Sequence, residues 1–230
     1  MKPDEKYYKG LVDRVHCELD ALVAAGKTMF ATSSFQSQSL PLLKMLGERR
    51  EHIKVALTNT GFLFPETVAF AHSICQEYGL ELVEVRSEVP KSLQKSDDGR
   101  FLYVSDPDYC CVMNKTSPLE PVLKQFDVWI NGVRRDQSSS RASLEKYEDA
   151  KHDTLRYHPM LNWTGKDIYY FRKVFKLRDH PLEAKGYQSV GCQPCTFKSI
   201  MGANERNSRW MGMNKTECGL NTDLIVSSNG

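Results

Sequence analysis

The sequence carries almost no excess charge of either sign and contains no long apolar run. Its 31 Lys and Arg nearly balance 29 Asp and Glu, which leaves a net charge of +2. A general nucleic-acid binder would show a stronger basic bias, so any basic site should be local. No stretch approaches the roughly 20 apolar residues that cross a bilayer, and the charged start MKPDEKYYKG lacks the apolar centre of a signal peptide. We therefore expect a cytoplasmic protein that contacts neither nucleic acid nor membrane.

Internal repeats and two common nucleotide-binding motifs are also absent. No GxxxxGK[ST] occurs, which excludes a Walker A loop, and no GxGxxG occurs, which disfavours a dinucleotide-binding Rossmann fold. Cysteine, by contrast, is well represented, with seven in the chain. In a cytosolic chain of 230 residues this number points to metal binding or catalysis more than to structural disulfides.

Apolar periodicity predicts alternating strands and helices over about the first 135 residues. Pro41 and Pro65 are tolerated in the first turns of two helices, and Gly79 is a plausible stop for the second. The alternation predicts an α/β fold with a parallel twisted sheet flanked by helices. Strands are expected at 28–34, 53–59, 80–86 and 127–133, and helices at 5–26, 40–50 and 65–79.

After Arg135 the regular pattern weakens. An amphipathic helix is expected there over 163–177. Before the last predicted strand, a helix interrupted at Pro118 is expected over 110–126. The remainder is rich in loop residues. We therefore expect the α/β body to end near Arg135 and a helical, loop-rich C-terminal part to carry much of the special chemistry.

Polar loops follow three of the predicted strands at their carboxyl ends, where open α/β sheets bind ligands. The loop ATSSFQSQS presents hydroxyls and backbone N–H groups at the start of a helix, which suits phosphate. TNTGFLFPET follows the second strand. NGVRRDQSSSR places Arg134 and Arg135 beside Gly132, which suits phosphate or sulfate. Any one loop alone is better explained as a solvated turn, but three together favour a binding site.

Two pairs of cysteines form a candidate metal site. Cys110 and Cys111 are adjacent, and Cys192 and Cys195 form GCQPC, late in the chain and after a loop, where a thioredoxin-like redox pair is not expected. Four thiolates suit tetrahedral Zn²⁺ or an iron–sulfur cluster. Two neighbours are awkward ligands for one small ion, whereas a cubane binds them through separate irons, which favours [4Fe–4S]. In the alternative, Cys111 is a buried apolar residue and only the CxxC matters.

The other three cysteines differ in their surroundings. Cys17 and Cys75 fall within predicted amphipathic helices and are expected in the core. Cys218 stands in the polar stretch NKTECGLNTD with no second cysteine nearby. A lone cysteine near a C-terminus is, taken by itself, more often incidental than catalytic.

Six separated motifs, in chain order from Met29 to Leu220, resemble those of the assimilatory sulfonucleotide reductases. They are SSF, NTGFLFPET, CC…K, GVRRDQSSSRA, GCQPCT and ECGL. The resemblance is close to the cluster-containing adenylyl-sulfate (APS) reductase branch. It implies the fold of the adenine-nucleotide α-hydrolase-like (PP-loop type) enzymes. It also implies thiol-dependent reduction of APS to sulfite and AMP in sulfate assimilation, through an S-sulfocysteine on the enzyme.

The resemblance further implies roles for individual residues. Cys218 matches the nucleophile, and Lys115 lies where the family has a lysine between cluster and substrate. Arg206 and Arg209 match paired arginines that hold the sulfate end. The implied ligands of the [4Fe–4S] cluster are Cys110, Cys111, Cys192 and Cys195. The remaining residues that we expect to bind substrate are Ser33, Ser34, Phe35, Gln36, Ser37, Gln38, Asn59, Thr60, Gly61, Arg134 and Arg135.

The implied route needs a second protein and a tail that moves. Thioredoxin or glutaredoxin would supply the resolving thiol, and a homo-oligomer is possible. We expect one reductase domain over 1–203 and a mobile tail over 204–230, in which Gly212 and Gly219 leave the backbone flexible. Asn59 replaces the aspartate of the family's DTG, and Asn221 replaces the histidine of its ECGLH. Activation of Cys218 should therefore rest on nearby cations.

Three other functions fit parts of the same sequence. A reductase for the 3′-phosphorylated nucleotide (PAPS) is the nearest, although members of that branch typically lack the four cysteines. An ATP-dependent PP-loop thiolase or ligase would usually carry an SGGxDS-type loop, and SSFQSQS lacks its glycines and aspartate. A zinc-binding interaction module could be built on the four cysteines alone.

Overall fold

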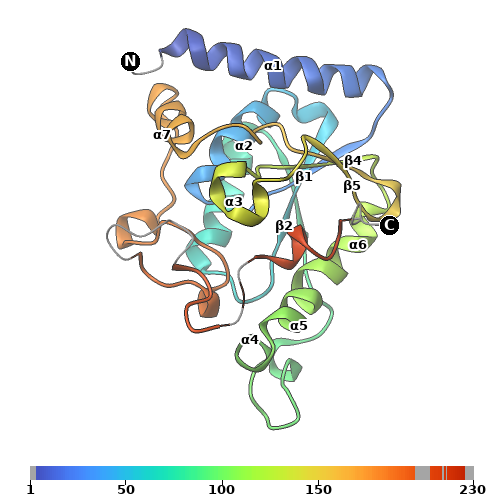
Figure 1. The fold of residues 1–230 in the computed structure, drawn as a ribbon, viewed down its shortest axis with the longest axis vertical. Coiled ribbons are helices and arrows are strands. Elements are labelled where there is room, and N and C mark those ends of the chain that lie inside the picture. Colours follow the sequence, from blue (N-terminus) through green and yellow to red (C-terminus); the bar gives the residue numbers. More distant parts are fainter. Residues whose placement is uncertain (1–3, 200–207, 214, 216, 226–230) are drawn as a thin grey trace.

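The fold is built around one six-stranded sheet. The computed structural model describes residues 4–199, 208–213, 215 and 217–225 (Figure 1). The strand order is β3-β2-β1-β4-β6-β5, and all neighbours run parallel except the pair β5 and β6. The strands are β1 Met29–Thr32, β2 Ile53–Thr58, β3 Glu81–Val85, β4 Val128–Asn131, β5 Tyr147–Asp149 and β6 Leu155–Tyr157.

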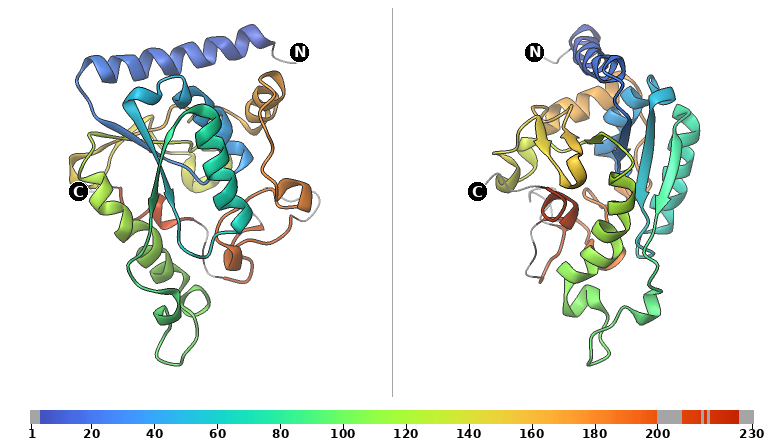
Figure 2. Two further views of the ribbon diagram at one scale, coloured as in Figure 1. Left: turned by 180° about the vertical axis from the view of Figure 1, so that it is seen from behind. Right: turned by 90° about the vertical axis from the view of Figure 1, so that its right-hand side faces the viewer.

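Helices cover both faces of this sheet. Figure 2 shows α3 on one side of the strands and α6 on the other. The helices are α1 Glu5–Ala24, α2 Leu40–Gly47, α3 Pro65–Tyr78, α4 Leu102–Ser105, α5 Pro107–Cys111, α6 Ser117–Leu123 and α7 Gly165–Val174. The predicted parallel sheet flanked by helices is therefore confirmed.

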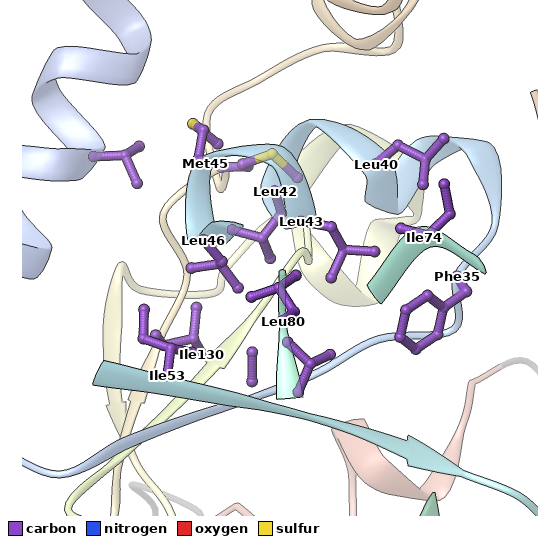
Figure 3. Close-up of a cluster of buried hydrophobic side chains, with 14 of the residues drawn as sticks. Phe35, Leu40, Leu42, Leu43, Met45, Leu46, Ile53, Ile74, Leu80 and Ile130 are labelled. Carbon is purple, nitrogen blue, oxygen red and sulfur yellow. The ribbon is translucent and has the colours of Figure 1, made fainter. Parts of the chain in front are cut away.

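Alternation along the central strands divides the core into two apolar clusters. Met29 and Ala31 of β1 point to the side of α1, α2, α3 and α7, whereas Phe30 between them points to the side of α6. Trp129 lies directly opposite Phe30 in the register, and the two rings stack with centroids 6.3 Å apart. Both faces are buried, which is why these strands read as continuous apolar runs. Figure 3 shows the larger cluster, with Phe35 facing the same interior as the leucines of α2.

Capping residues explain where several helices begin and end. The carboxylate of Asp4 accepts from the Tyr7 N–H at 2.9 Å and caps α1. Thr164 and Asp167 form a reciprocal capping box at the start of α7. Gly79 adopts the left-handed conformation that ends α3, at φ 67°. The predicted helix stop at Gly79 is thus confirmed.

The helical segment between β3 and β4 differs from its prediction. The interruption lies in a π-helical turn, Val112–Thr116, and not at Pro118. Pro118 sits in the first turn of α6, directly after the π-helical turn. The wider turn occurs directly after the adjacent cysteines. Such turns are frequent at functional sites because they re-aim the side chains that follow.

Two further predictions need correction. The sheet does not end near Arg135, because β5 and β6 extend it; strands of three residues are too short to show a period of two. Cys17 is exposed, whereas Cys75 is buried as expected. The buried stripe of α1 passes through Val15 and Leu19, and Cys17 midway between them points to the opposite side.

Among the described residues, no helix combines the length and the apolar character that crossing a bilayer requires.

Candidate active site

A cavity of about 190 Å³ opens at the carboxyl ends of β1, β2 and β4. Side chains from all three strand ends meet here because parallel strands end at the same edge of a sheet. Residues from the C-terminal part close the cavity from the other side. The residues that line the cavity include Thr32, Ser33, Ser34, Gln36, Gln38, Thr58, Lys115, Trp129, Asn131, Gly132, Gln137, Arg141, Gly191, Cys192, Arg209, Cys218 and Asn221.

The loop after β1 contributes four of its six predicted residues. Ser33, Ser34, Gln36 and Gln38 line the cavity. Phe35 is fully buried in the core, at a backbone φ of 53°, and this turns its neighbours outward. The remaining residue is Ser37, which lies in a different environment.

Ser37 serves the structure of the C-terminal part. Its hydroxyl accepts from the backbone N–H of His180 at 2.8 Å and donates to the Glu183 carboxylate. These bonds join the loop after β1 to a segment more than 140 residues away in sequence. Ser37 is therefore a packing residue of the site, and it does not line the cavity.

The loop after β2 lies mostly beside the cavity. The Asn59 amide donates to the Glu84 carboxylate at 2.7 Å, and Gly61 accepts through its carbonyl from Lys91 at 2.8 Å. An aspartate at position 59 would face Glu84 with a second carboxylate, so the asparagine fits its local surroundings. Thr60 bonds through its hydroxyl to the Cys192 sulfur at 3.2 Å. Of the three residues, Thr60 alone contacts one of the paired cysteines.

The loop after β4 brings a different arginine to the cavity than expected. Arg134 is buried against Asp136 and Gln38, and Arg135 bonds to the Leu144 carbonyl; neither lines the cavity. Two successive 3₁₀ turns carry the chain back, so that Arg141 reaches the lining instead. A sequence scan could have noted Arg141 inside GVRRDQSSSRA, but no local pattern distinguishes it from its neighbours.

The four paired cysteines gather at one place. Cys110, Cys111, Cys192 and Cys195 all line a small second cavity, together with Thr60 and Lys115. They arrive from α5 and from the 3₁₀ turn Gln193–Cys195. Two polar side chains contact their sulfurs: the Thr60 hydroxyl shares a hydrogen bond with Cys192, and the Asn114 amide donates to Cys110 at 3.6 Å.

Burial determines the ionisation of these thiols. Burial, followed by repulsion from neighbouring thiolates, raises the pKa of Cys110 to about 12 and that of Cys195 to about 11. Bare thiols so placed would stay protonated at neutral pH, and bound metal is what makes such sulfurs thiolates. Among the described residues, no three His, Cys, Asp or Glu stand at the spacing of one metal ion.

Cys218 lies next to a buried cation. The Lys115 ammonium, 9% exposed as a residue, is 3.6 Å from the Cys218 sulfur, which also lines the cavity. Burial by itself raises the pKa of Cys218. Lys115, the Leu220 N–H and Arg209 outweigh it, so the pKa lies below its ordinary value.

Lys115 remains charged for the complementary reason. Burial alone lowers the pKa of its ammonium, but the facing sulfurs of Cys192, Cys218 and Cys111 hold that pKa well above the ordinary value. The π-helical turn aims this side chain between the cysteine group and the cavity. Lys115 is therefore a fixed positive charge that both sites share.

Arg209 supplies another cation. Its guanidinium lies over the Trp210 ring at 4.6 Å, and its Nε donates to the Cys195 carbonyl at 3.1 Å. A Cβ at Gly191 would approach this guanidinium to 2.2 Å, so the glycine of GCQPC makes room for it. Arg206, which we expect to act beside Arg209, lies outside the described residues.

The family described as phosphoadenosine phosphosulfate reductase domain matches residues 28–198. The chain belongs to this family. The match takes in both cysteine pairs, the π-helical turn and all three polar loops, so the geometry above is that of a sulfonucleotide reductase domain. The predicted membership of the sulfonucleotide reductases is confirmed.

Curated relatives within this reductase family cover nearly the whole chain. The adenosine 5′-phosphosulfate reductase of Bacillus pumilus (strain SAFR-032) is 32% identical over 197 residues, 85% of this chain and 84% of that protein. Adenosine 5′-phosphosulfate reductase 1 of Bacillus subtilis (strain 168) is 30% identical over 220 residues, 95% and 93% of the two chains. The Mesorhizobium japonicum protein of the same description is 35% identical over 190 residues, 83% and 74%.

Solved structures support the fold of the reductase domain. The phosphoadenylyl-sulfate reductase of Candida auris, in a phosphate complex, has a TM-score of 0.65 at 17% identity, covering 84% of this chain and 97% of that one. An FMN adenylyltransferase of Candida glabrata has a TM-score of 0.55 at 14% identity, covering 83% and 64%. The predicted PP-loop type fold is thereby confirmed.

Several lining residues of the reductase cavity escaped the sequence analysis. Trp129 and Asn131 of β4 face it, although both read as ordinary strand residues. Arg141 and Gln137 follow the same strand. Asn221 was noted only as a departure from the family motif, and it lines the cavity as well. The position of Asn131 at the carboxyl end of β4 is a signal that could have identified it.

Proposed function

We propose that this chain is a thiol-dependent APS reductase of sulfate assimilation, which converts APS to sulfite and AMP through an S-sulfocysteine on Cys218. The observation that carries the proposal is the Cys218 sulfur, 3.6 Å from the Lys115 ammonium inside the cavity. Hydroxyls from the loop after β1 line the same cavity. The relatives from Bacillus pumilus and Bacillus subtilis are described as APS reductases. A thiolate, an anion-binding loop and fixed cations are the groups that this reaction requires.

In the first step the Cys218 thiolate attacks the sulfur of APS. The S–S bond forms as the bond from that sulfur to the bridging phosphate oxygen breaks, and AMP leaves with the electron pair. Lys115, Arg209 and Arg141 line the cavity and would stabilise the charge that moves onto phosphate and sulfate. Ser33, Ser34, Gln36 and Gln38 would hold the phosphate side.

In the second step a thiolate of thioredoxin or glutaredoxin attacks the Cys218 sulfur. Sulfite leaves with the electrons of the S–S bond, and the second thiol of the reductant then frees Cys218. Two thiols thus become one disulfide, which balances the two-electron reduction of sulfate sulfur to sulfite. We place this exchange in the cytoplasm, where such dithiols are kept reduced.

The cysteine pairs would hold a [4Fe–4S] cluster. Cys110, Cys111, Cys192 and Cys195 are the proposed ligands, with Thr60 and Asn114 hydrogen-bonded to their sulfurs. When bound, the cluster would supply a fixed structural and electrostatic centre beside the cavity. The reducing electrons come from the protein thiols, so no step depends on electron transfer through it.

We expect the anaerobically purified protein to be brown, with broad visible absorption, and Cys195→Ser to lose iron and colour. A cluster held by four thiolates loses its closed coordination when one is removed. Cys75→Ser is the matched control, because Cys75 is also a buried thiol but lies in α3. Iron, sulfide and zinc analysis checks the result. A colourless protein with stoichiometric zinc would overturn the cluster assignment and support the interaction module.

The reaction itself is tested by mixing the anaerobic protein with APS and no reductant. The expected products are AMP and a covalent SO₃ adduct found by intact mass, and sulfite should appear only when thioredoxin or glutaredoxin is added. Release of sulfite without an adduct would contradict the proposed intermediate. Turnover of ATP to AMP and pyrophosphate would support a thiolase or ligase instead.

PAPS is the second candidate substrate, because the family description and the Candida auris structure both refer to it. Among the described residues, the cationic side chains that line the cavity are Lys115, Arg141 and Arg209. These suffice for one phosphate and one sulfate, whereas a 3′-phosphate would need further partners. We expect kcat/KM for APS to exceed that for PAPS at least about tenfold. A preference for PAPS in side-by-side assays would reverse the choice.

A further inference from the structure

The segment that carries Cys218 is held by a buried ion pair. Glu217, directly before the cysteine, accepts from Nε and Nη2 of Arg141, both at 2.8 Å. Each side chain is only 8% exposed. The same carboxylate accepts from the Cys218 N–H at 2.8 Å and from the Asn221 amide at 3.1 Å. Glu217 thus joins a cavity arginine to the backbone that presents the thiol.

A second arginine holds the other end of this turn. Arg156 of β6 donates through Nη2 to the Asn221 side-chain carbonyl, and its guanidinium lies over the Trp129 ring at 4.7 Å. Arg156 is fully buried, and its Nε and Nη1 find no hydrogen-bond partner among the described residues. Glu148 of β5 lies 3.9 Å from Nη1 and supplies the opposite charge, while the Asn221 carbonyl accepts the hydrogen bond.

Both arginines belong to the sheet body, and both partners belong to the 3₁₀ turn Gly219–Asn221 or its flank. Separating the turn from the body would take Glu217 from Arg141 and Asn221 from Arg156, and would leave Gln137 and Glu148 as their remaining partners. Removing one partner of a buried charged pair is strongly unfavourable, so the docked position is held firmly. The bidentate geometry also fixes the direction in which Cys218 faces Lys115.

An apolar anchor lies just beyond the polar contacts. Leu224 is fully buried in the cluster under α6, and the Lys151 N–H donates to its carbonyl at 3.0 Å. This anchor does not depend on charge. The chain around Cys218 can therefore lose its polar contacts while remaining tethered at Leu224.

We propose that Glu217 and Asn221 are positioning residues. By binding Arg141 and Arg156 they form a latch, which holds the Cys218 segment in place while the thiolate attacks the substrate. The latch opens when the protein thiol must reach Cys218. The proposal rests on the assigned role of Cys218. The proposed latch also accounts for Asn221, which stands where the family motif has histidine. A neutral amide offers its carbonyl to Arg156 and its N–H to Glu217, whereas a protonated histidine would add a third positive charge there.

The latch has a consequence that separates positioning from substrate binding. Glu217 pairs with Arg141 and weakens the positive charge that this arginine presents to the cavity. Glu217→Gln should therefore slow formation of the SO₃ adduct while leaving the Kd of AMP unchanged or lower. A residue that bound the nucleotide would raise that Kd.

The direct experiment measures how readily Cys218 meets a large reagent. A polymer-linked maleimide is reacted with the full anaerobic protein over a range of pH, and peptide mass analysis gives the rates at Cys218 and at Cys17. Cys17 is exposed on α1 and serves as an internal reference. The plateau rate at high pH reports access to the segment, because the thiol is then ionised in every variant, whereas the midpoint reports its pKa.

We expect Glu217→Gln to raise the plateau ratio of Cys218 to Cys17 at least about tenfold, and Asn221→Leu to raise it about threefold. Glu217→Asp, which keeps the charge, should restore part of the protection. Thr222→Ala is the matched control, since Thr222 is an exposed residue of the same segment and bonds only within it. Plateau ratios equal to wild type in both latch variants would overturn the proposal, as would an equal rise in the control.

This readout needs no substrate, so it separates the latch from the reaction. A raised plateau together with no SO₃ adduct in the wild type would retain the latch and reject the APS reductase assignment. An SO₃ adduct in the wild type, together with unchanged plateau ratios in the latch variants, would retain the APS reductase assignment and reject the latch.

Discussion

Replacing Cys218 with serine should abolish the SO₃ adduct and lower the rate of sulfite formation at least about 10³-fold. A serine hydroxyl is not ionised near neutral pH, and Lys115 at 3.6 Å cannot bring its pKa into that range. A sulfate ester on serine would also lack the side-chain sulfur that the protein thiol attacks when sulfite leaves. Intact mass after APS addition and a sulfite assay check both effects.

The other thiols provide the controls for this result. Cys17→Ser changes an exposed thiol and Cys75→Ser a buried one, and neither lies at the cavity. Both variants should keep the adduct and the rate. An adduct that persists in Cys218→Ser would show that another cysteine is the nucleophile.

Replacing Lys115 with methionine should lower kcat/KM about 10²- to 10³-fold. Lys115 stabilises both the Cys218 thiolate and the charge that develops on the substrate. Because its ammonium lowers the pKa of Cys218, its removal raises that pKa. The adduct rate, which rises with pH through the thiolate fraction, should then reach half its plateau at a higher pH than in the wild type. Single-turnover adduct formation across pH measures both changes.

Lys124→Met is the matched control for that variant. Lys124 follows α6 directly, on the same helical segment, but it is exposed and does not line the cavity. Its loss should leave the rate and the midpoint unchanged. If Lys115→Met kept the wild-type midpoint and rate, the thiol would draw its activation from other groups, such as Arg209.

The central part of the fold could be predicted because each piece has a local cause. Met29, Phe30 and Ala31 are all apolar since a parallel strand is covered on both faces. Pro65 and Gly79 mark the ends of α3 because their backbones suit only those positions. The short strands β5 and β6 show no such signal, and their pairing with each other and with β4 depends on contacts between distant segments.

The site residues also divide into those that the local sequence could predict and those that depend on contacts between distant segments. Loop position alone indicated Ser33 and Ser34, which line the cavity. It could not distinguish Arg135, which bonds to the Leu144 carbonyl, from Arg141, because two 3₁₀ turns decide which arginine returns to the cavity. Asn221 became interpretable only once Arg156 was found beside it.

By itself the sequence determined the order of strands and helices up to β4. It also determined the chemistry available to the chain, which includes four paired cysteines, the separate Cys218 in a polar stretch and Lys115. Periodicity, capping residues and motif spacing are properties of neighbouring residues, so they can be read without coordinates. The tertiary structure decided which cations reach Cys218 and what holds its segment. Glu217 and Arg141 are 76 residues apart, and Lys115 and Cys218 are 103 apart. Contacts over such separations arise only when the packing of the sheet brings the segments together.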